Sequence, residues 1–197
     1  LVYPILWFIS ILPYRPFYLL SDFVFFLVYS IAGYRKKVVY GNLKLVFPEK
    51  GEREIQQIQR AFYGHMCDMF MEMIKTMHLS KAEVKKRYEV TNLEVLQEIE
   101  KTKSVLIVCS HYANWEWNVS INNYIDAKGY AVYQKIANTY FDNWIKKVRA
   151  RWNTTLITQE ETVKTVVRNV QNNVTSVYGM VSDQSPQAHR APYWTEF

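Results

Sequence analysis

The stretch "SVLIVCSHYANWEWN", Ser104 to Asn118, joins an apolar run to a histidine and, five positions later, a glutamate. Its first part predicts a buried strand, because it is short, apolar and rich in β-branched residues. Asn114 is a good helix N-cap, so Glu116 is expected in the first turn of a following helix. His111 then lies at the carboxyl end of the strand, the edge where ligands bind in an open α/β sheet. The stretch therefore predicts a strand–helix unit with a site at its turn.

The same alternation continues outward from this unit. Helices are predicted at residues 91–101, 114–129, 139–152 and 159–173, and strands at 104–110, 130–135, 154–158 and 176–182. Gly129 is expected to close the second of these helices. Upstream, apolar residues at three- and four-residue steps from Ile55 to Met77 predict one long amphipathic helix, and residues 79–90 predict a short basic helix that leads into a strand. The whole pattern predicts an α/β fold with a mainly parallel sheet flanked by helices on both faces.

The first 37 residues differ from the rest of the chain. Leu1–Leu12 and Phe17–Gly33 are apolar blocks, separated by "PYRP" and followed by a basic run at 35–37. Neither block has the roughly 20 continuous apolar residues of a straight membrane-spanning helix, and the second contains Asp22. The change from apolar to basic beside tyrosines favours a hydrophobic membrane anchor at 1–37, either spanning or interfacial, with its basic end in the cytoplasm. A signal-like segment before a buried core helix is the alternative.

Residues 38–197 form the predicted α/β domain. The chain begins with Leu1 rather than Met and stops where an apolar pattern is resuming, so we expect a longer protein in which this domain continues beyond the carboxyl end. The 197 residues include 24 Lys and Arg and 18 Asp and Glu, which gives a net charge of +6. This charge suits an anionic partner such as an acidic carrier protein, a phospholipid surface or nucleic acid. Nucleic acid is not expected, since the lysines are spread along the chain. The two cysteines, Cys67 and Cys109, favour a reducing compartment over a disulfide framework.

The spacing of His111 and Glu116, H-x4-E, can form a local dyad. A carboxylate that accepts a hydrogen bond from one ring nitrogen raises the basicity of the other, which can then take a proton from an alcohol. Backbone N–H groups at the helix start can stabilise an oxyanion. Structural roles also fit the spacing, because strand-end histidines often form structural hydrogen bonds and acidic residues favour first helical turns. The sequence has no motif typical of a zinc site, a serine hydrolase or a nucleotide-binding loop, so no metal or cofactor is expected.

Four segments, in order, resemble one family. "HYANWE" is similar to the H-x4-D/E motif of the glycerolipid acyltransferase superfamily, and specifically to the H-x-x-N-W-E form of the bacterial late acyltransferases of lipid A biosynthesis. "YRKKVVYGNLKLVFPE" resembles the family's basic segment with N-L-x-x-x-F-P, and "KKVRARWNTTLI" resembles its arginine-bearing helix and strand. "VYGMVSDQSP" resembles its apolar strand that ends in D-Q or D-H. The family usually has Gly in place of Ala113, and its pattern continues past "YWTEF".

The resemblance implies a membrane-associated enzyme of lipopolysaccharide synthesis. It would transfer a fatty acyl chain from an acyl-carrier protein or acyl-CoA thioester to a hydroxyl of a lipid A precursor, at the cytoplasmic side of the bacterial inner membrane and without a cofactor. His111 would be the general base, and Glu116 would orient it and compensate its charge. The substrate-binding residues that the resemblance implies are Asn114, Arg149, Arg151, Asp183 and Gln184.

Alternatives to these roles stay open at the level of sequence. Guanidinium groups suit the phosphate groups of an acceptor or of a phosphopantetheine arm, yet an arginine pair at a helix end also simply complements the helix dipole. The acceptor can equally be a lysophospholipid, an aminolipid or a glycosylated phosphoinositide. A non-enzymatic alternative is a membrane-binding module in which His111 and Glu116 only brace the sheet.

Overall fold

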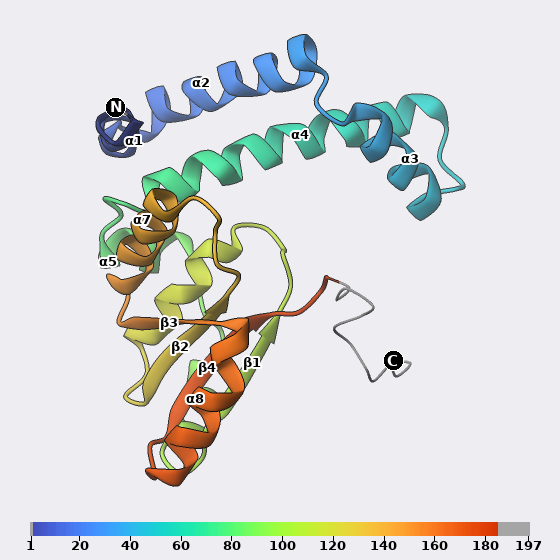
Figure 1. Cartoon of the computed structure of the whole chain (residues 1–197). Helices are drawn as coiled ribbons and strands as arrows, with labels where there is room; N and C mark the ends of the chain where they lie inside the picture. The colour runs from blue at the N-terminus through green and yellow to red at the C-terminus, as the bar shows by residue number, and fades with distance from the viewer. Residues whose placement is uncertain (1, 185–197) are drawn as a thin grey trace. The chain divides into compact units, whose positions relative to one another are not determined.

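The chain divides into two compact units, one ending at Ser80 and the other beginning at Lys81 (Figure 1). The computed structural model describes residues 2–184. The first unit is helical, with α1 (Val2–Ile11), α2 (Tyr14–Phe25), the π-helix η1 (Phe26–Ala32), α3 (Lys36–Val46) and α4 (Glu52–Lys75). The domain boundary that the sequence suggested, after residue 37, lies inside this unit, because α2 and α3 both pack along the long helix α4.

The apolar helices of the first unit begin and end at the residues that backbone chemistry favours. Pro13 precedes α2 and interrupts the apolar run after α1, as expected from a ring that disfavours a continuous helix. Gly33 follows η1 with a left-handed φ of 59°, a conformation that costs glycine nothing. Between them, Tyr14–Ala32 forms one run of 19 residues, and by length and apolar composition alone it is able to cross a membrane.

The second unit confirms the predicted α/β class. It contains α5 (Lys81–Arg87), α6 (Leu93–Glu100), β1 (Val105–Cys109), the 3-10 helix η2 (Trp115–Asn123), β2 (Lys128–Tyr133), α7 (Thr139–Ala150), β3 (Thr154–Thr158), α8 (Gln159–Gln171) and β4 (Ser176–Val181). The four strands form a parallel sheet in the order β1-β4-β2-β3 (Figure 1). Within the described residues the last strand, β4, is therefore central, and it lies between β1 and β2.

Two local predictions were wrong. The strand expected to follow the short basic helix of residues 79–90 does not form, since α6 is the next element, and the helix expected to end at Gly129 is a 3-10 helix that already ends at Asn123. The carboxylate of Glu100 accepts hydrogen bonds from the backbone N–H groups of Asp126 and Ala127, at 3.1 and 3.0 Å, which stabilises a turn where the helix was expected. Gly129 instead lies in β2, where a Cβ atom would come within 2.4 Å of the Asn122 side chain. This glycine permits close packing rather than a helix end.

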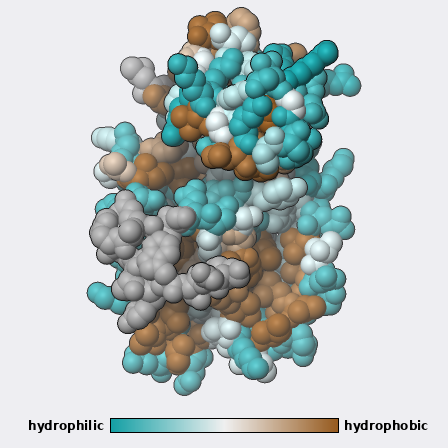
Figure 2. All heavy atoms as spheres, turned by 90° about the vertical axis from the view of Figure 1, so that its right-hand side faces the viewer, coloured by the Kyte–Doolittle hydropathy of each residue, from teal (hydrophilic) through white to brown (hydrophobic). Residues whose placement is uncertain are grey.

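One face of the sheet is covered unevenly from strand to strand. Where this face packs against α8, Tyr130, Ile157 and Tyr178 form a buried cluster, and the two tyrosine rings stack with centroids 5.1 Å apart. On the same face at β1, where Leu106 is paired with Tyr178, Leu106 and Val108 are 55% and 64% exposed. Figure 2 shows apolar side chains gathered on the side of the molecule that carries this strand. Within residues 2–184, the predicted cover of helices on both faces is therefore incomplete at β1.

Candidate active site

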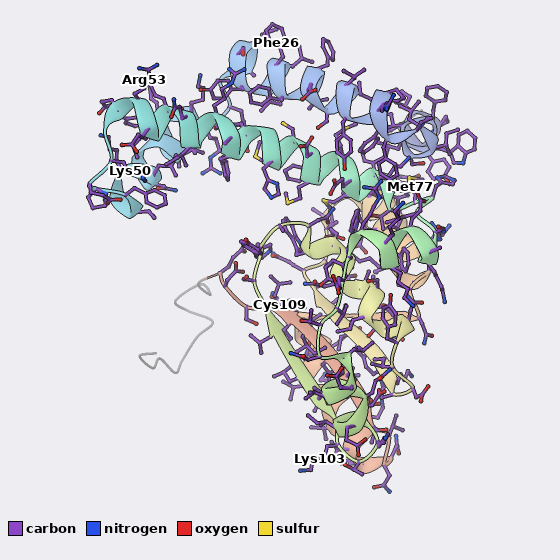
Figure 3. The ribbon with its side chains drawn as sticks, turned by 180° about the vertical axis from the view of Figure 1, so that it is seen from behind. Phe26, Lys50, Arg53, Met77, Lys103 and Cys109 are labelled. Atoms are coloured by element: carbon purple, nitrogen blue, oxygen red, sulfur yellow. The ribbon has the colours of Figure 1, made fainter. Side chains whose placement is uncertain are left out.

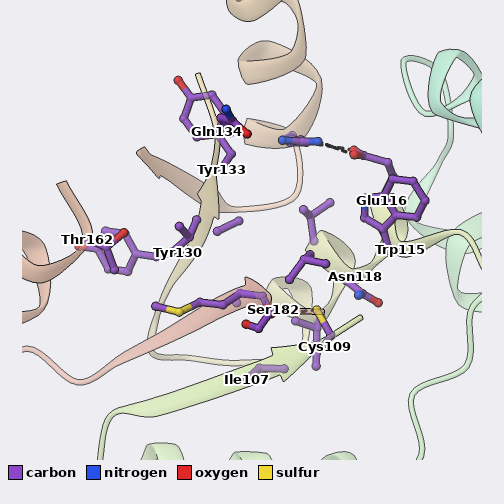
Figure 4. Close-up of a pocket in the computed structure, with 18 of the residues that line it drawn as sticks. Ile107, Cys109, Trp115, Glu116, Asn118, Tyr130, Tyr133, Gln134, Thr162 and Ser182 are labelled. Atoms are coloured by element: carbon purple, nitrogen blue, oxygen red, sulfur yellow. Dashed lines mark hydrogen bonds and ion pairs between the residues drawn. The ribbon is translucent and has the colours of Figure 1, made fainter. Parts of the chain in front are cut away.

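A cavity of about 680 Å³ lies at the carboxyl ends of the strands of the second unit (Figure 4). Polar side chains in its lining include His111, Glu116, Gln134, Arg149 and Gln184. Apolar side chains in its lining include Ile107, Val119, Ala131, Val163 and Met180. Cavities of about this size, with apolar walls and a few polar side chains, are typical of sites for small organic ligands.

The cavity reaches residues on both sides of the sheet because β2 and β4 separate near their ends. These strands pair only as far as Ala131 opposite Gly179. Beyond that point β2 continues to pair with β3 as far as Tyr133, and β4 continues to pair with β1 as far as Val181. The lining accordingly includes Asn118 of η2 and Thr162 of α8, which Figure 4 draws on opposite sides of the strands. The lining therefore comes from both sides of the sheet where β2 and β4 are no longer paired.

His111 pairs with the carboxylate of Asp183. The Nδ1 atom of His111 lies 2.6 Å from Oδ1 of Asp183, and the backbone N–H of His111 donates to Oδ2 at 2.8 Å. Each residue follows a strand end, and because β1 and β4 are neighbours these ends meet. Both hydrogen bonds lower the pKa of the Asp183 carboxyl, so it is ionised and holds a hydrogen on Nδ1. The other ring nitrogen, Nε2, is then the one that can accept a proton.

Glu116 pairs with Arg149 instead of His111. It lies in the first turn of η2, as predicted, and is only 7% exposed. The Nε atom of Arg149 donates to Oε2 at 3.0 Å, and Nη2 donates to Oε1, which makes a two-pronged ion pair (Figure 4). The expected hydrogen bond from His111 to Glu116 is thus replaced in this structure by one from His111 to Asp183. An arginine fork fits a carboxylate better than a single ring nitrogen does.

The other predicted site residues divide into two groups. Gln184 lines the cavity beside the strand end. Asn114 occupies the N-cap position of η2 but makes no side-chain capping bond, and Arg151 is an exposed residue at the C-cap of α7. Neither of these two side chains belongs to the part of the cavity lining that the structure describes. Four of the predicted site residues therefore line one cavity: His111, Glu116, Arg149 and Gln184. Asp183 is connected to this cavity by its hydrogen bond with His111.

Several lining residues were missed from the sequence. Gln134 follows directly after β2, so the rule that sites form at strand ends would have found it. Tyr88 and Asn118 carried no such signal, because the hydrogen bond from the Tyr88 hydroxyl to the Asn118 side chain joins distant segments. Burial raises the pKa of both Tyr88 and Cys109, so both are neutral at the cavity wall.

Among the described residues, no group of three or more His, Cys, Asp or Glu is placed to hold a metal ion. In comparisons with known proteins, the family model described as bacterial lipid A biosynthesis acyltransferase matches residues 1–191, a range that includes both units. Among curated proteins, none matches this chain.

Proposed function

The chain belongs to the bacterial lipid A biosynthesis acyltransferase family, and we propose that it moves a fatty acyl chain from a thioester to a hydroxyl of a lipid A precursor. Because the chain is a member of this family, it is an acyltransferase of lipid A synthesis, and its reaction requires an acyl donor and a lipid acceptor. Beyond membership, the proposal depends on one observation: His111 is held at a strand end through Nδ1, with Nε2 left as the basic nitrogen.

In the proposed reaction, Nε2 of His111 takes the proton of the acceptor hydroxyl as its oxygen attacks the thioester carbonyl carbon. The C–O bond forms and a tetrahedral oxyanion develops. When this intermediate collapses, the C–S bond breaks, and the thiolate leaves with the proton that His111 has taken. The ester and the free thiol balance the hydroxyl and the thioester, so no covalent acyl-enzyme is needed. Asp183 stabilises the imidazolium between the two proton transfers.

Two further groups fit this reaction. Backbone N–H groups of the first turn of η2 are close in sequence to His111 and suit the developing oxyanion. Arg149 uses two of its donors on Glu116, which fixes the guanidinium in the cavity wall and leaves further donors for a phosphate of either substrate. In this proposal Glu116 acts on the base indirectly, through the arginine that it orients, rather than through the dyad expected from its spacing.

The apolar lining and the split between β2 and β4 suit the acyl chain. Its methylenes would lie against Ile107, Ala131 and Met180 while the thioester carbonyl stays near His111. For the donor, we propose an acyl-carrier protein. Acyl-carrier proteins are acidic, and this chain has a net charge of +6, so the two attract each other. The basic run at 35–37 beside the apolar helices favours the cytoplasmic side of the inner membrane, where acyl thioesters are made.

The test is transfer by the full chain in detergent, with acyl-carrier protein and acyl-CoA thioesters as donors. A lipid A precursor and a lysophospholipid are the two acceptors, the products are identified by mass spectrometry, and the His111→Ala variant is the matched control. We expect acylation of the lipid A precursor that disappears in the variant. Acylation of the lysophospholipid alone would reassign the acceptor, and no thioester cleavage with any pair would contradict the proposed reaction.

A further inference from the structure

The apolar helices of the first unit are hydrogen-bonded to charged side chains of α4. The hydroxyl of Tyr18 donates to Glu72 at 2.6 Å, and the hydroxyl of Ser21 donates to Asp68 at 2.6 Å. At the bend between α1 and α2, the ammonium of Lys75 donates to the backbone carbonyl of Leu12. These contacts occur over successive turns of α4, and Figures 1 and 3 both show α2 and η1 running alongside it. The apolar run is thus one layer of a two-layer hairpin whose second layer is α4.

The second layer is unsuited to the interior of a bilayer. Over its 24 residues α4 carries Glu52, Arg53, Glu54, Arg60, Asp68, Glu72 and Lys75. Charged side chains in the hydrocarbon are costly and rare. If Tyr14–Ala32 crossed the membrane, it would either take these charges with it or lose its hydrogen bonds to them. The 19-residue length therefore does not decide between crossing a membrane and lying on it.

The side of the apolar helices that faces away from α4 is exposed and hydrophobic. Leu19, Phe23 and Ile31 are 69%, 55% and 66% exposed, and Phe26 projects from the far side of the hairpin (Figure 3). Arg15 and Asp22, seven residues and two turns apart, lie exposed along one flank of this surface. Asp22 is near the middle of Tyr14–Ala32, where a spanning helix would place its carboxylate close to the bilayer centre. A helix in the membrane plane would instead keep both charges at the water boundary.

A basic segment follows directly after the apolar helices. Arg35 and Lys37 are exposed, and the ammonium of Lys36 lies 3.8 Å from the centre of the Tyr29 ring. Basic residues beside an aromatic ring are typical of the headgroup region, where they meet anionic phospholipids. In α3 the same surface type continues with Leu45 and Val46, which are 82% and 66% exposed. The apolar surface and the positive charge together match one partner, an anionic phospholipid leaflet.

We propose that α1, α2 and η1 lie in the plane of one leaflet of an anionic phospholipid bilayer, with α4 on the water side, and that Tyr14–Ala32 does not cross the membrane. Both ends of this run are then on the same side. The proposal concerns attachment only, and its tests measure no acyl transfer, so its failure would leave the proposed reaction standing.

The first test compares the two ends of the run in cells that express the full chain. Single substitutions Arg15→Cys and Lys37→Cys are treated with a membrane-impermeant maleimide in spheroplasts and in inside-out vesicles, and the parent chain gives the background from Cys67 and Cys109. We expect both variants to react in inside-out vesicles and neither in spheroplasts. Reaction of the Arg15→Cys variant from the spheroplast side, or only after detergent is added, overturns the proposal.

The second test measures binding of the purified chain to vesicles that contain phosphatidylglycerol. Leu19→Glu combined with Phe23→Glu places charges on the proposed lipid-facing side, and we expect binding to fall at least about tenfold. Val170→Glu is the matched control, because Val170 is a 62% exposed valine on α8 of the other unit, and its binding should equal that of the parent. Circular dichroism checks that each variant is folded. Equal binding of the double variant and the control would refute in-plane attachment through this surface.

Discussion

Two ion pairs serve the same cavity in very different surroundings. The side chains of His111 and Asp183 are 31% and 37% exposed, whereas those of Arg149 and Glu116 are 18% and 8% exposed. An exposed pair contributes little to stability, and its members can change protonation at small cost. A buried pair is expensive to break, because the remaining charge is left without a partner. In the proposed reaction, this difference favours the first pair for proton transfer and the second for support of the cavity wall.

The largest expected effect comes from His111→Ala. Loss of a general base costs about 10²- to 10⁴-fold in rate, and the imidazole is the only group in the described lining that we assign to that role. The measurement is kcat/KM for acyl transfer, with thermal unfolding as the check on folding. A variant that turns over at a near-normal rate would place the base elsewhere.

Asp183→Asn tests the exposed pair without removing the base. The amide keeps the shape of the side chain but loses the charge that stabilises the imidazolium, and we expect about a 10- to 100-fold lower kcat. The melting temperature should change little, since the pair is exposed. If Asn at this position is harmless and Glu116→Gln instead lowers kcat most strongly, the His111–Glu116 dyad expected from spacing is the working arrangement.

The same variant has a predictable pH dependence. The pKa of the Asp183 carboxyl is lowered in the folded protein by the hydrogen bonds that it accepts from His111. The stabilisation from this carboxylate is therefore fully present at pH values above the pKa of an aspartate in the unfolded chain, about 3.9. This contribution is lost as the pH falls through the lowered folded pKa. Any difference in melting temperature between the parent and Asp183→Asn should therefore persist at pH 5 to 7 and close below about pH 4. A difference that persists or widens well below about pH 4, where the carboxyl of Asp183 is protonated, would contradict the pairing.

Glu116→Gln is expected to act mainly on stability. Glutamine can accept one hydrogen bond from Arg149 but leaves the partly buried guanidinium without a counter-charge, at a cost of about 1–3 kcal/mol in the free energy of unfolding. Chemical denaturation of the parent, Glu116→Gln, Arg149→Met and the double variant measures the coupling between the two residues. Additive losses would show that the pair contributes nothing as a pair.

Individual strand ends could be predicted from the sequence, but the contacts between them could not. His111 and Asp183 each follow a short apolar run that ends abruptly in polar residues, a local signal. Which carboxylate reaches the imidazole depends on strand order, and β4 inserts beside β1 although η2, β2, α7, β3 and α8 lie between them in the sequence. Short sequence distance favoured Glu116, and the parallel sheet brought Asp183 closer.

The local sequence was also an insufficient guide to the role of Gly129 and to the contacts of α4. A glycine after a helical pattern usually signals a helix end, but here the side chain of Asn122 requires its small size within a strand. The amphipathic period of α4 was plain in the sequence, whereas its polar contacts with the apolar helices come from residues 47 to 63 positions apart. Such long-range pairing decides both the unit boundary and which side of the apolar helices stays exposed.

The smallest expected effect separates the two arginines. Arg149 lines the cavity and is fixed by Glu116, so Arg149→Lys should lower kcat/KM, because an ammonium cannot reproduce the two-pronged contact. Arg151 is exposed at the end of α7, where lysine complements the helix dipole equally well, and we expect Arg151→Lys to change kcat/KM by less than about fivefold.

Salt makes this comparison sharper. If the proposed acyl-carrier protein is the donor, kcat/KM for it should fall as salt screens the long-range attraction between this acidic protein and the net charge of +6, in the parent and in Arg151→Lys alike. Acyl-CoA, measured at the same low and high salt, controls for effects on the reaction itself. If Arg151→Lys loses as much as Arg149→Lys with both donors at both salt concentrations, Arg151 contacts the substrate and the division between a buried functional arginine and an exposed structural one is wrong.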